Sequence, residues 1–182
     1  MGDFLLSVPS NDYIFLTEWQ IPAPVDVVYE ILKSGRDYPR WWPDVYLEAH
    51  AELPDADGLV GDAVTLLTKG RLPYRLRWTA TLVRLQNPTE IELTASGDFV
   101  GRGLWRLEPR SDGTHVIFDW RIRADKPLLK WFSSVLKPLF RWNHRWAMAT
   151  GLERLKAEAS RRLTSTEPRR LDEIEKRPLA SL

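Results

Sequence analysis

A run of six strand-like segments constrains the fold of this chain more than any other feature. Between residues 45 and 124, apolar and polar side chains alternate with a period of two, which is typical of strands with one dry face and one wet face. Short links such as Gln86 to Thr89 and Ser111 to Gly113 suit hairpins, so we expect an antiparallel sheet. The predicted strands are 45–53, 62–69, 74–86, 90–98, 100–109 and 114–124.

A further strand and a short helix precede this run. The alternation from Tyr13 to Ile21 predicts a strand that two prolines end. From Asp26 the apolar residues recur at helical spacing, and Gly35 marks the end of this predicted helix. The aromatic and proline-rich stretch 37–44 has room for one helical turn at most.

The pattern becomes helical after the last strand. An amphipathic stretch covers 128–136, and we expect a break near Lys137, because Pro138 lacks the backbone donor that a helix interior needs. A second helix is predicted from Leu139 to about Leu163, long enough to cross a whole sheet.

These elements define one domain at residues 12–163. We expect an N-terminal extension at 1–11, and a disordered, charged tail at 164–182, because that segment mixes prolines with charges and lacks aromatic residues. A length of 182 residues suits a single domain.

The overall composition excludes several classes of protein. There are 26 basic and 25 acidic residues, so the net charge of +1 gives no strong attraction to nucleic acid. The absence of cysteine removes disulfides and thiolate chemistry and is compatible with a reducing cytoplasm. No signal peptide and no membrane-spanning run is evident, so we expect a soluble, cytoplasmic protein without stable membrane insertion.

The order of these elements resembles the START-like helix-grip (SRPBCC) superfamily over residues 12–163. The resemblance rests on that order, on Tyr38-Pro-Arg-Trp-Trp-Pro-Asp-Val45 after the first helix, and on Leu152-Glu-Arg-Leu-Lys156 in the last one. The stretch from Pro138 to Gly151 is similar to the polyketide cyclase/dehydratase-like branch.

The resemblance implies an α+β helix-grip fold, in which a curved seven-stranded antiparallel sheet wraps around a long C-terminal helix. It also implies a pocket between sheet and helix, because members of the superfamily bind lipids, sterols, polyketides, plant hormones or ubiquinone there. Some members cyclise or dehydrate their ligand, so the resemblance implies a pocket but no single reaction.

Five of the nine tryptophans are candidates for this pocket. Trp78, Trp105 and Trp120 lie on the apolar side of their strands. They either fill a core or line a cavity, and three indoles whose N–H groups need partners favour the cavity. Trp41 and Trp42 lie between two prolines and form either part of a gate or a hydrophobic plug.

One face of the last predicted helix supplies the remaining candidates. Helical spacing places Phe140, His144, Met148 and Gly151 on the face that looks at the sheet. Gly151 would leave room for a ligand or for the close approach of another backbone segment. His144 is either a buried neutral histidine held by one hydrogen bond, or a group that contacts the ligand or transfers a proton.

Other residues of this helix leave alternatives open. Trp142 and Trp146 lie on a different face, where they either pack on the preceding stretch or remain exposed. Asn143 points away from His144 and is expected to anchor a loop or the segment before Pro138. The direction of Arg102 also stays open, because Gly101 and Gly103 beside it are compatible with a bulge that turns it inward.

The sequence argues against metal and cofactor chemistry. His50, His115 and His144 are far apart, unlike the closely spaced histidine pair of the iron-dependent oxygenases in this superfamily. Nucleotide-binding, serine hydrolase and zinc protease motifs are absent. We therefore expect no metal and no cofactor.

Three functions fit these observations. The first is a binding or carrier protein for an apolar small molecule such as a lipid, polyketide or quinone. The second is a metal-free cyclase or dehydratase, a lyase or isomerase, with His144 as general acid or base, assisted by Tyr29, Tyr74 or Arg102. The third is a protein interaction module that uses Trp142, Trp146 and the charged tail, which requires both indoles to be exposed and the cavity to be absent. The geometry of the cavity would discriminate among them, whereas the ligand and the oligomeric state stay undetermined.

Overall fold

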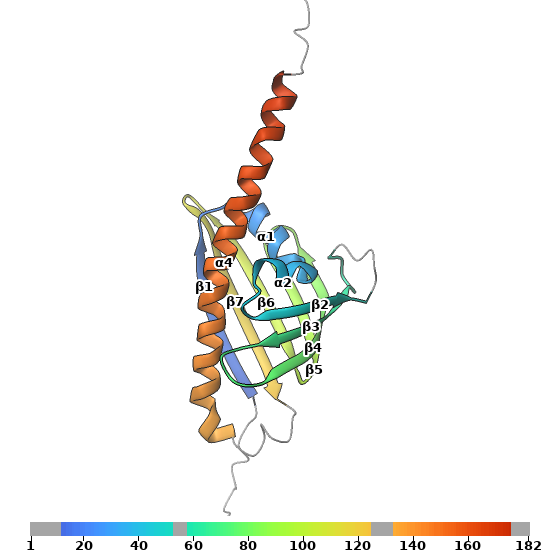
Figure 1. The fold of residues 1–182 in the computed structure, drawn as a ribbon, viewed down its shortest axis with the longest axis vertical. Helices are drawn as coiled ribbons and strands as arrows, with labels where there is room; N and C mark the ends of the chain where they lie inside the picture. Colours follow the sequence, from blue (N-terminus) through green and yellow to red (C-terminus); the bar gives the residue numbers. More distant parts are fainter. Residues whose placement is uncertain (1–11, 53–57, 125–132, 176–182) are drawn as a thin grey trace, which may run out of the picture.

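The computed structural model describes residues 12–52, 58–124 and 133–175 (Figure 1). One antiparallel sheet contains seven strands in the order β1-β7-β6-β5-β4-β3-β2. The strands are β1 (Asp12–Ile21), β2 (Tyr46–Ala51), β3 (Ala63–Lys69), β4 (Arg75–Gln86), β5 (Glu90–Gly97), β6 (Phe99–Arg110) and β7 (Gly113–Ala124). From β2 to β7 each strand pairs with the next one in the chain, whereas β1 pairs with β7 at one edge.

The strand bounds agree with the predicted ones to within two residues, because most strands alternate between more buried and more exposed side chains. The strand β3 departs from this pattern, since Leu66, Leu67 and Thr68 are all buried. On β4, Trp78 is buried and its neighbour Arg77 is exposed, and on β6 the same holds for Trp105 and Arg106. Register shifts in the β2–β3 and β4–β5 pairs introduce irregularities that accompany bending of a sheet. The predicted curved, seven-stranded antiparallel sheet is therefore confirmed.

Three short helices cover one end of the sheet. They are α1 (Val25–Lys33), the 3₁₀ turn η1 (Gly35–Asp37) and α2 (Tyr38–Trp41), which matches the single helical turn expected in this aromatic stretch. Pro39 lies in the first turn of α2, where its missing N–H costs no helical hydrogen bond. These helices close that end of the sheet with a cluster of buried aromatic rings.

The long helix α4 (Ser133–Glu175) runs along the sheet and extends beyond it (Figure 1). The predicted break near Lys137 is wrong, since α4 continues through Pro138. Pro138 removes one helical hydrogen bond, the one that a backbone N–H at this position would donate to the carbonyl of Ser134, and the helix continues despite this loss. Residues 125–132, which include the beginning of the predicted 128–136 stretch, lie outside the described residues.

The predicted end of this helix near Leu163 is also wrong. Helical structure continues to Glu175, so the first part of the expected tail at 164–182 is helical. The hydroxyls of Thr164 and Ser165 donate to the carbonyls of Ser160 and Arg161, which lets these polar residues continue the last turns. The N-terminal 1–11 and the final 176–182 lie outside the described residues.

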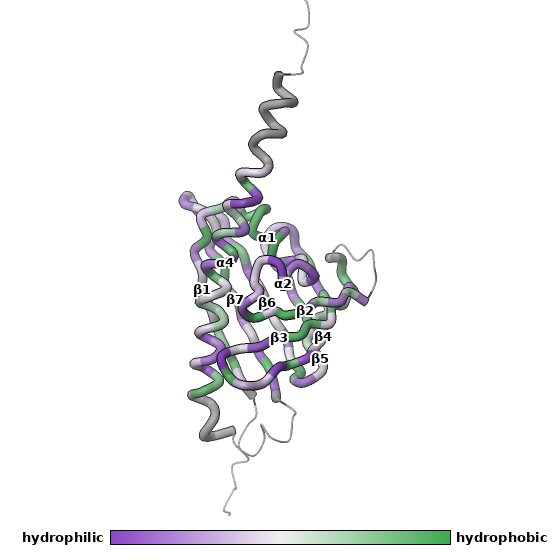
Figure 2. Tube along the Cα trace, viewed as in Figure 1, coloured by the Kyte–Doolittle hydropathy of each residue, from purple (hydrophilic) through white to green (hydrophobic). Residues whose placement is uncertain are grey.

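The hydrophobic core lies between the dry face of the sheet and the helices. Hydrophobic and hydrophilic residues are mixed along α4, as in a helix with one face on a core (Figure 2). Leu155 and Ala159 of α4 are fully buried, as are Val28 and Ile31 of α1. Towards Phe140 and His144 the same face of α4 borders a cavity instead.

Candidate functional site

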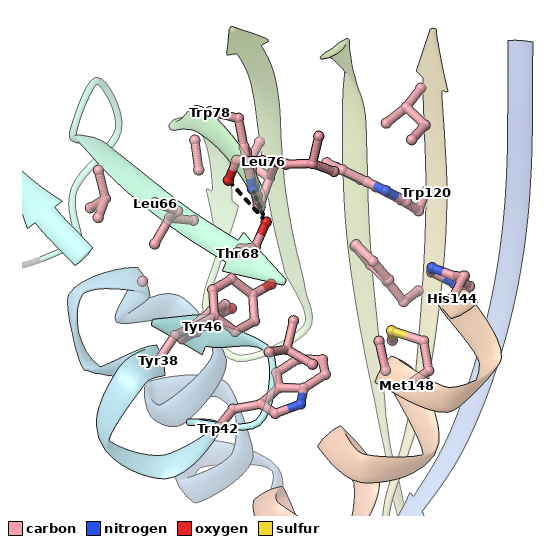
Figure 3. Close-up of a pocket in the computed structure, with 18 of the residues that line it drawn as sticks. Tyr38, Trp42, Tyr46, Leu66, Thr68, Leu76, Trp78, Trp120, His144 and Met148 are labelled. Atoms are coloured by element: carbon pink, nitrogen blue, oxygen red, sulfur yellow. Dashed lines mark hydrogen bonds between the residues drawn. The ribbon is translucent and has the colours of Figure 1, made fainter. Parts of the chain in front are cut away.

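A cavity of about 220 Å³ lies between the concave face of the sheet and α4. Figure 3 shows His144 and Met148 on α4, with Trp120 on the sheet and Trp42 and Tyr46 on the side of the short helices. Most of the lining is apolar or aromatic. The predicted site residues that line it are Trp42, Trp78, Trp105, Trp120, Phe140, His144 and Met148.

Two predicted site residues do not line this cavity. Trp41 is buried and stacks on Trp42, with 5.4 Å between the ring centroids, so it supports the wall from behind. Gly151 lies against the indole of Trp42, where an added Cβ would overlap the ring. The glycine therefore allows the ring to approach the helix, and the room that we expected for a ligand is filled by Trp42.

The tryptophans of the sheet form a continuous aromatic wall. Trp105 stacks on Phe118 at 3.8 Å between centroids, Phe118 stacks on Trp120 at 5.5 Å, and Trp120 lies 5.7 Å from Trp78. The Trp78 indole N–H donates to the hydroxyl of Thr68 at 3.2 Å (Figure 3). This wall can pack against a flat or flexible apolar molecule and offers it few polar groups.

His144 and its neighbour Asn143 are the polar residues of α4 among those that line the cavity. The His144 ring stacks on Phe15 with 4.1 Å between centroids, and its Nε2 is buried with no hydrogen-bond partner among the described residues. Burial lowers the pKa of His144 to about 4, because the charged ring loses its hydration. The imidazole is therefore neutral near pH 7, and Nε2 is left for a ligand.

Two tyrosines lie at the same end of the cavity. Tyr13 and Tyr74 approach the ring of Phe140, with centroid distances of 5.5 and 6.4 Å. The Tyr13 hydroxyl is buried without a hydrogen-bond partner in the described chain, and burial raises the pKa of Tyr74 to about 12. Both phenols stay protonated, so this end can donate or accept hydrogen bonds without carrying charge.

Of the three residues considered as partners for His144, only Tyr74 lines the cavity. Tyr29 is buried in the core, and Arg102 lies on the exposed face of β6, where it pairs with Glu92 at 2.8 Å. Arg102 therefore faces away from the cavity, and no bulge turns it inward. The sequence analysis missed Tyr13, although its place on the dry face of the first strand and its hydroxyl were available signals.

The neighbouring residues of α4 hold the β3–β4 turn. Asn143 Oδ1 accepts a hydrogen bond from the backbone N–H of Arg71 at 2.8 Å, which confirms its expected role as a loop anchor. The Arg71 guanidinium lies over the rings of Trp142 and Trp146, at 5.6 and 6.0 Å from the centroids. Trp146 packs partly into the core, whereas Trp142 is 47% exposed.

The histidines do not converge on a metal site. His50 is exposed beside Glu48, His115 lies beside Glu18, and His144 faces the cavity. Within residues 12–52, 58–124 and 133–175, no three potential ligands among His, Cys, Asp and Glu come together. None of the helices in these ranges is long and apolar enough to span a membrane.

Solved structures with the same fold come from several kinds of protein. The Zhui aromatase/cyclase from Streptomyces sp. R1128 has a TM-score of 0.65 and 16% identity, over 84% of this chain and 96% of that one. The protein TTHA0849 from Thermus thermophilus also has a TM-score of 0.65, with 17% identity over 81% and 96% of the two chains. Ara h 8.0201 has a TM-score of 0.57 and 12% identity, over 84% and 99%. At these identities the likeness shows the fold alone.

The sequence comparison identifies the family. A comparison with curated proteins finds no match. The model of the family described as "Polyketide cyclase / dehydrase and lipid transport" matches residues 15–160, which cover the sheet and the part of α4 that packs on it. The fold and the cavity agree with the helix-grip superfamily to which that family belongs. The chain is therefore a member of the polyketide cyclase/dehydrase and lipid transport family.

Proposed function

We propose that this protein binds a mainly apolar small molecule, ring-containing or long-chain, in the cavity between the sheet and α4. The observation that carries the proposal is the lining of that cavity, which is largely aromatic and aliphatic. Polar groups line it at two places: beside His144 and Tyr13, and on the side of the short helices, where Lys33, Arg36 and Asp62 contribute. Pockets of this kind draw affinity from apolar contact and orientation from a small number of hydrogen bonds. A polyketide, lipid or quinone-like molecule has this combination of properties.

The polar end of the cavity supports a ligand with at least one oxygen function. His144 Nε2 and the Tyr13 hydroxyl are both buried and unpartnered in the described chain. Buried polar groups without partners are costly, so a ligand hydroxyl or carbonyl placed there would restore their hydrogen bonds. The likeness to an aromatase/cyclase adds aromatic polyketides to the candidate ligands.

A saturable binding assay tests this proposal. An apolar fluorescent probe or a fatty acid should bind with a stoichiometry near one and quench tryptophan emission, because Trp78, Trp105 and Trp120 line the cavity. Ala147→Leu should weaken binding at least tenfold, since Ala147 lines the cavity. Ala149→Leu makes the same change at an exposed position of α4 and is the control. Equal binding by both variants and the parent would mean that the probe lies elsewhere.

The natural ligand can be sought directly. Native mass spectrometry of the protein purified from its own host should show a complex with a retained small molecule. The mass of that molecule would separate lipids from polyketides and quinones. Recovery of only the unliganded chain, together with failure of the probe assay, would contradict the proposal.

A cyclase or dehydratase activity is the second candidate. The supporting observation is that His144, Tyr13 and Tyr74 converge on one end of the cavity. A pKa of about 4 makes His144 a weak base at neutral pH, which favours binding over proton transfer in the unliganded protein. With His144→Gln, a carrier should keep most of its affinity for a purely apolar probe. An enzyme assayed on a polyketide substrate should lose turnover by about 10²–10⁴-fold.

The cavity argues against the third candidate, a protein interaction module. That alternative required exposed indoles and no internal void. Trp142 is 47% exposed, but Trp146 packs partly into the core and the void is present, so one of the two requirements is met in part and the other is not met.

A further inference from the structure

The basic residues of this chain are unevenly distributed along the sequence. Residues 63–89 and 126–152 contain no aspartate or glutamate, yet they carry ten of the 26 basic residues. The rest of the chain therefore holds 16 basic residues against 25 acidic ones. The net charge of +1 conceals two cationic segments in an otherwise acidic protein.

The fold brings these two segments together. The first contains β3, β4 and the turn between them, and the second contains the described beginning of α4. The hydrogen bond from Arg71 to Asn143 joins the turn to the helix, and Arg71 covers Trp142. In Figure 1 the β3–β4 turn reaches α4 towards the end of the molecule opposite α1.

The arginines at this end have no ion-pair partners among the described residues. Arg71, Arg75, Arg141 and Arg145 are all exposed, and none forms an ion pair within the part of the chain that the structure describes. On the outer face of the sheet, by contrast, exposed arginines pair with carboxylates. Those arginines are Arg84, Arg102, Arg106, Arg110 and Arg121. Free positive charge is therefore concentrated beside the β3–β4 turn and α4.

Exposed apolar side chains surround the same arginines. Ile14 and Leu16 of β1 are 68% and 65% exposed, and they line a shallow depression together with Arg141 and Arg145. The one carboxylate that also lines this depression, Glu18, lies 3.3 Å from His115. Trp142 is half exposed beside Arg71, and Leu139 is exposed one turn earlier in α4. Phe140, between them in sequence, lines the cavity, so this surface adjoins the ligand site.

We propose that this surface docks on an anionic lipid bilayer. It is called here the basic end, and it consists of Arg71, Arg75, Arg141, Arg145, Ile14, Leu16, Leu139 and Trp142. Unpaired arginines attract anionic headgroups, and tryptophan favours the boundary between headgroups and acyl chains. Exposed aliphatic side chains add apolar contact with the acyl chains of a bilayer, whereas the phosphate backbone of a nucleic acid offers no such apolar region. The docking goes beyond ligand binding, and it would place the polar end of the cavity next to a membrane that contains apolar molecules.

Vesicle co-sedimentation with the full chain tests the docking. Vesicles of phosphatidylcholine with about 30% phosphatidylglycerol should bind the protein at least tenfold more tightly than pure phosphatidylcholine vesicles, and raising the salt should weaken binding. Each basic residue at such a surface contributes about a fivefold gain in affinity, so the triple variant Arg71→Gln, Arg141→Gln, Arg145→Gln should bind roughly a hundredfold more weakly. Trp142→Ala should also reduce binding, by loss of interfacial contact.

The matched control is the triple variant Arg106→Gln, Arg110→Gln, Arg121→Gln, which removes the same charge from the paired arginines of the outer face and the β6–β7 turn. It should bind the anionic vesicles with the same affinity as the parent.

Three outcomes would overturn the docking proposal: equal losses of vesicle affinity in both triple variants, equal binding of the parent to anionic and neutral vesicles, or tighter binding of the parent to an oligonucleotide than to anionic vesicles. The soluble-probe assay on the basic-end variant separates the two proposals. If the basic-end variant binds the soluble probe and the parent does not bind anionic vesicles, the membrane-docking proposal is refuted and the ligand-binding proposal stands.

Discussion

At the scale of single residues, burial determines the chemistry of His144. The ring lies against Phe15, and its Nε2 has no hydrogen-bond partner in the described residues. The pKa falls from the ordinary 6.5 to about 4, because a cavity wall of aromatic rings solvates an imidazolium poorly. A neutral imidazole can bind the oxygen function of an otherwise apolar ligand without the cost of burying a charge.

The depressed pKa predicts a pH dependence of stability. Between about pH 6.5 and 4 the unfolded chain holds a proton on His144 that the folded protein does not bind. The free energy of unfolding should therefore fall as the pH drops through this window, by up to about 1.4 kcal/mol per pH unit from this group. Urea unfolding of the parent and of His144→Gln at pH 7, 6 and 5 measures the difference. Parallel pH profiles would show that the ring is not shielded from water.

A second residue-scale prediction concerns Gly151. Alanine normally stabilises the interior of a helix relative to glycine, by up to about 1 kcal/mol. Here the added Cβ would overlap the indole of Trp42, which is itself buried, so Gly151→Ala should lower the melting temperature despite its better helix propensity. Thermal unfolding followed by circular dichroism decides the sign. An increase in melting temperature would mean that Trp42 can withdraw at little cost.

At the scale of elements, one carboxylate joins α2 to α4. Glu158 of α4 is 5% exposed, and its carboxylate accepts hydrogen bonds from both terminal guanidinium nitrogens of Arg40 in α2, at 2.9 and 3.0 Å. Arg161 and Arg162 donate to the same carboxylate from within α4. These three guanidinium groups hold the pKa of Glu158 well below its usual range, since each hydrogen bond favours the ionised form. The clamp fixes the short helix that carries Trp41 and ends beside Trp42.

Glu158→Gln should reduce the free energy of unfolding by about 1–3 kcal/mol, the range expected when hydrogen bonds to a charged group are lost. Glu153→Gln, which removes an exposed pair with Lys156, is the control and should change stability by less than about 0.5 kcal/mol. The lowered pKa adds a second expectation. The stabilisation is present above the unfolded pKa near 4.5 and is lost as the pH falls below it, so the gap between parent and variant should narrow in acid.

At the scale of the whole molecule, α4 is longer than the sheet that it covers. Among the side chains that the structure describes in α4, the last buried one is Ala159, and those from Ser160 to Ser165 are partly or wholly exposed. Removal of residues 166–182 should shift the unfolding midpoint by no more than a few degrees, because this segment mixes prolines with charges and lacks aromatic residues that could be buried. A larger drop in denaturant or thermal unfolding would show that the extension makes stabilising contacts.

The sequence by itself determined the sheet, its antiparallel pairing and most of the site. Alternation with a period of two is a local property, so it places Trp78, Trp105 and Trp120 on one face without knowledge of their neighbours. Helical spacing does the same for Phe140, His144 and Met148. The resemblance of these elements to the helix-grip superfamily then supplied the way in which sheet and helix enclose a cavity.

Only the tertiary structure decided which residues meet across that cavity. Gly151 meets Trp42, Tyr13 joins His144 at the polar end, and Arg71 covers Trp142 through contacts between distant parts of the chain. The continuity of α4 through Pro138 was likewise visible only in the structure, because one missing hydrogen bond does not by itself end a long helix. A net charge is a sum that ignores position, so the basic end emerged only when the fold placed two acid-free segments side by side.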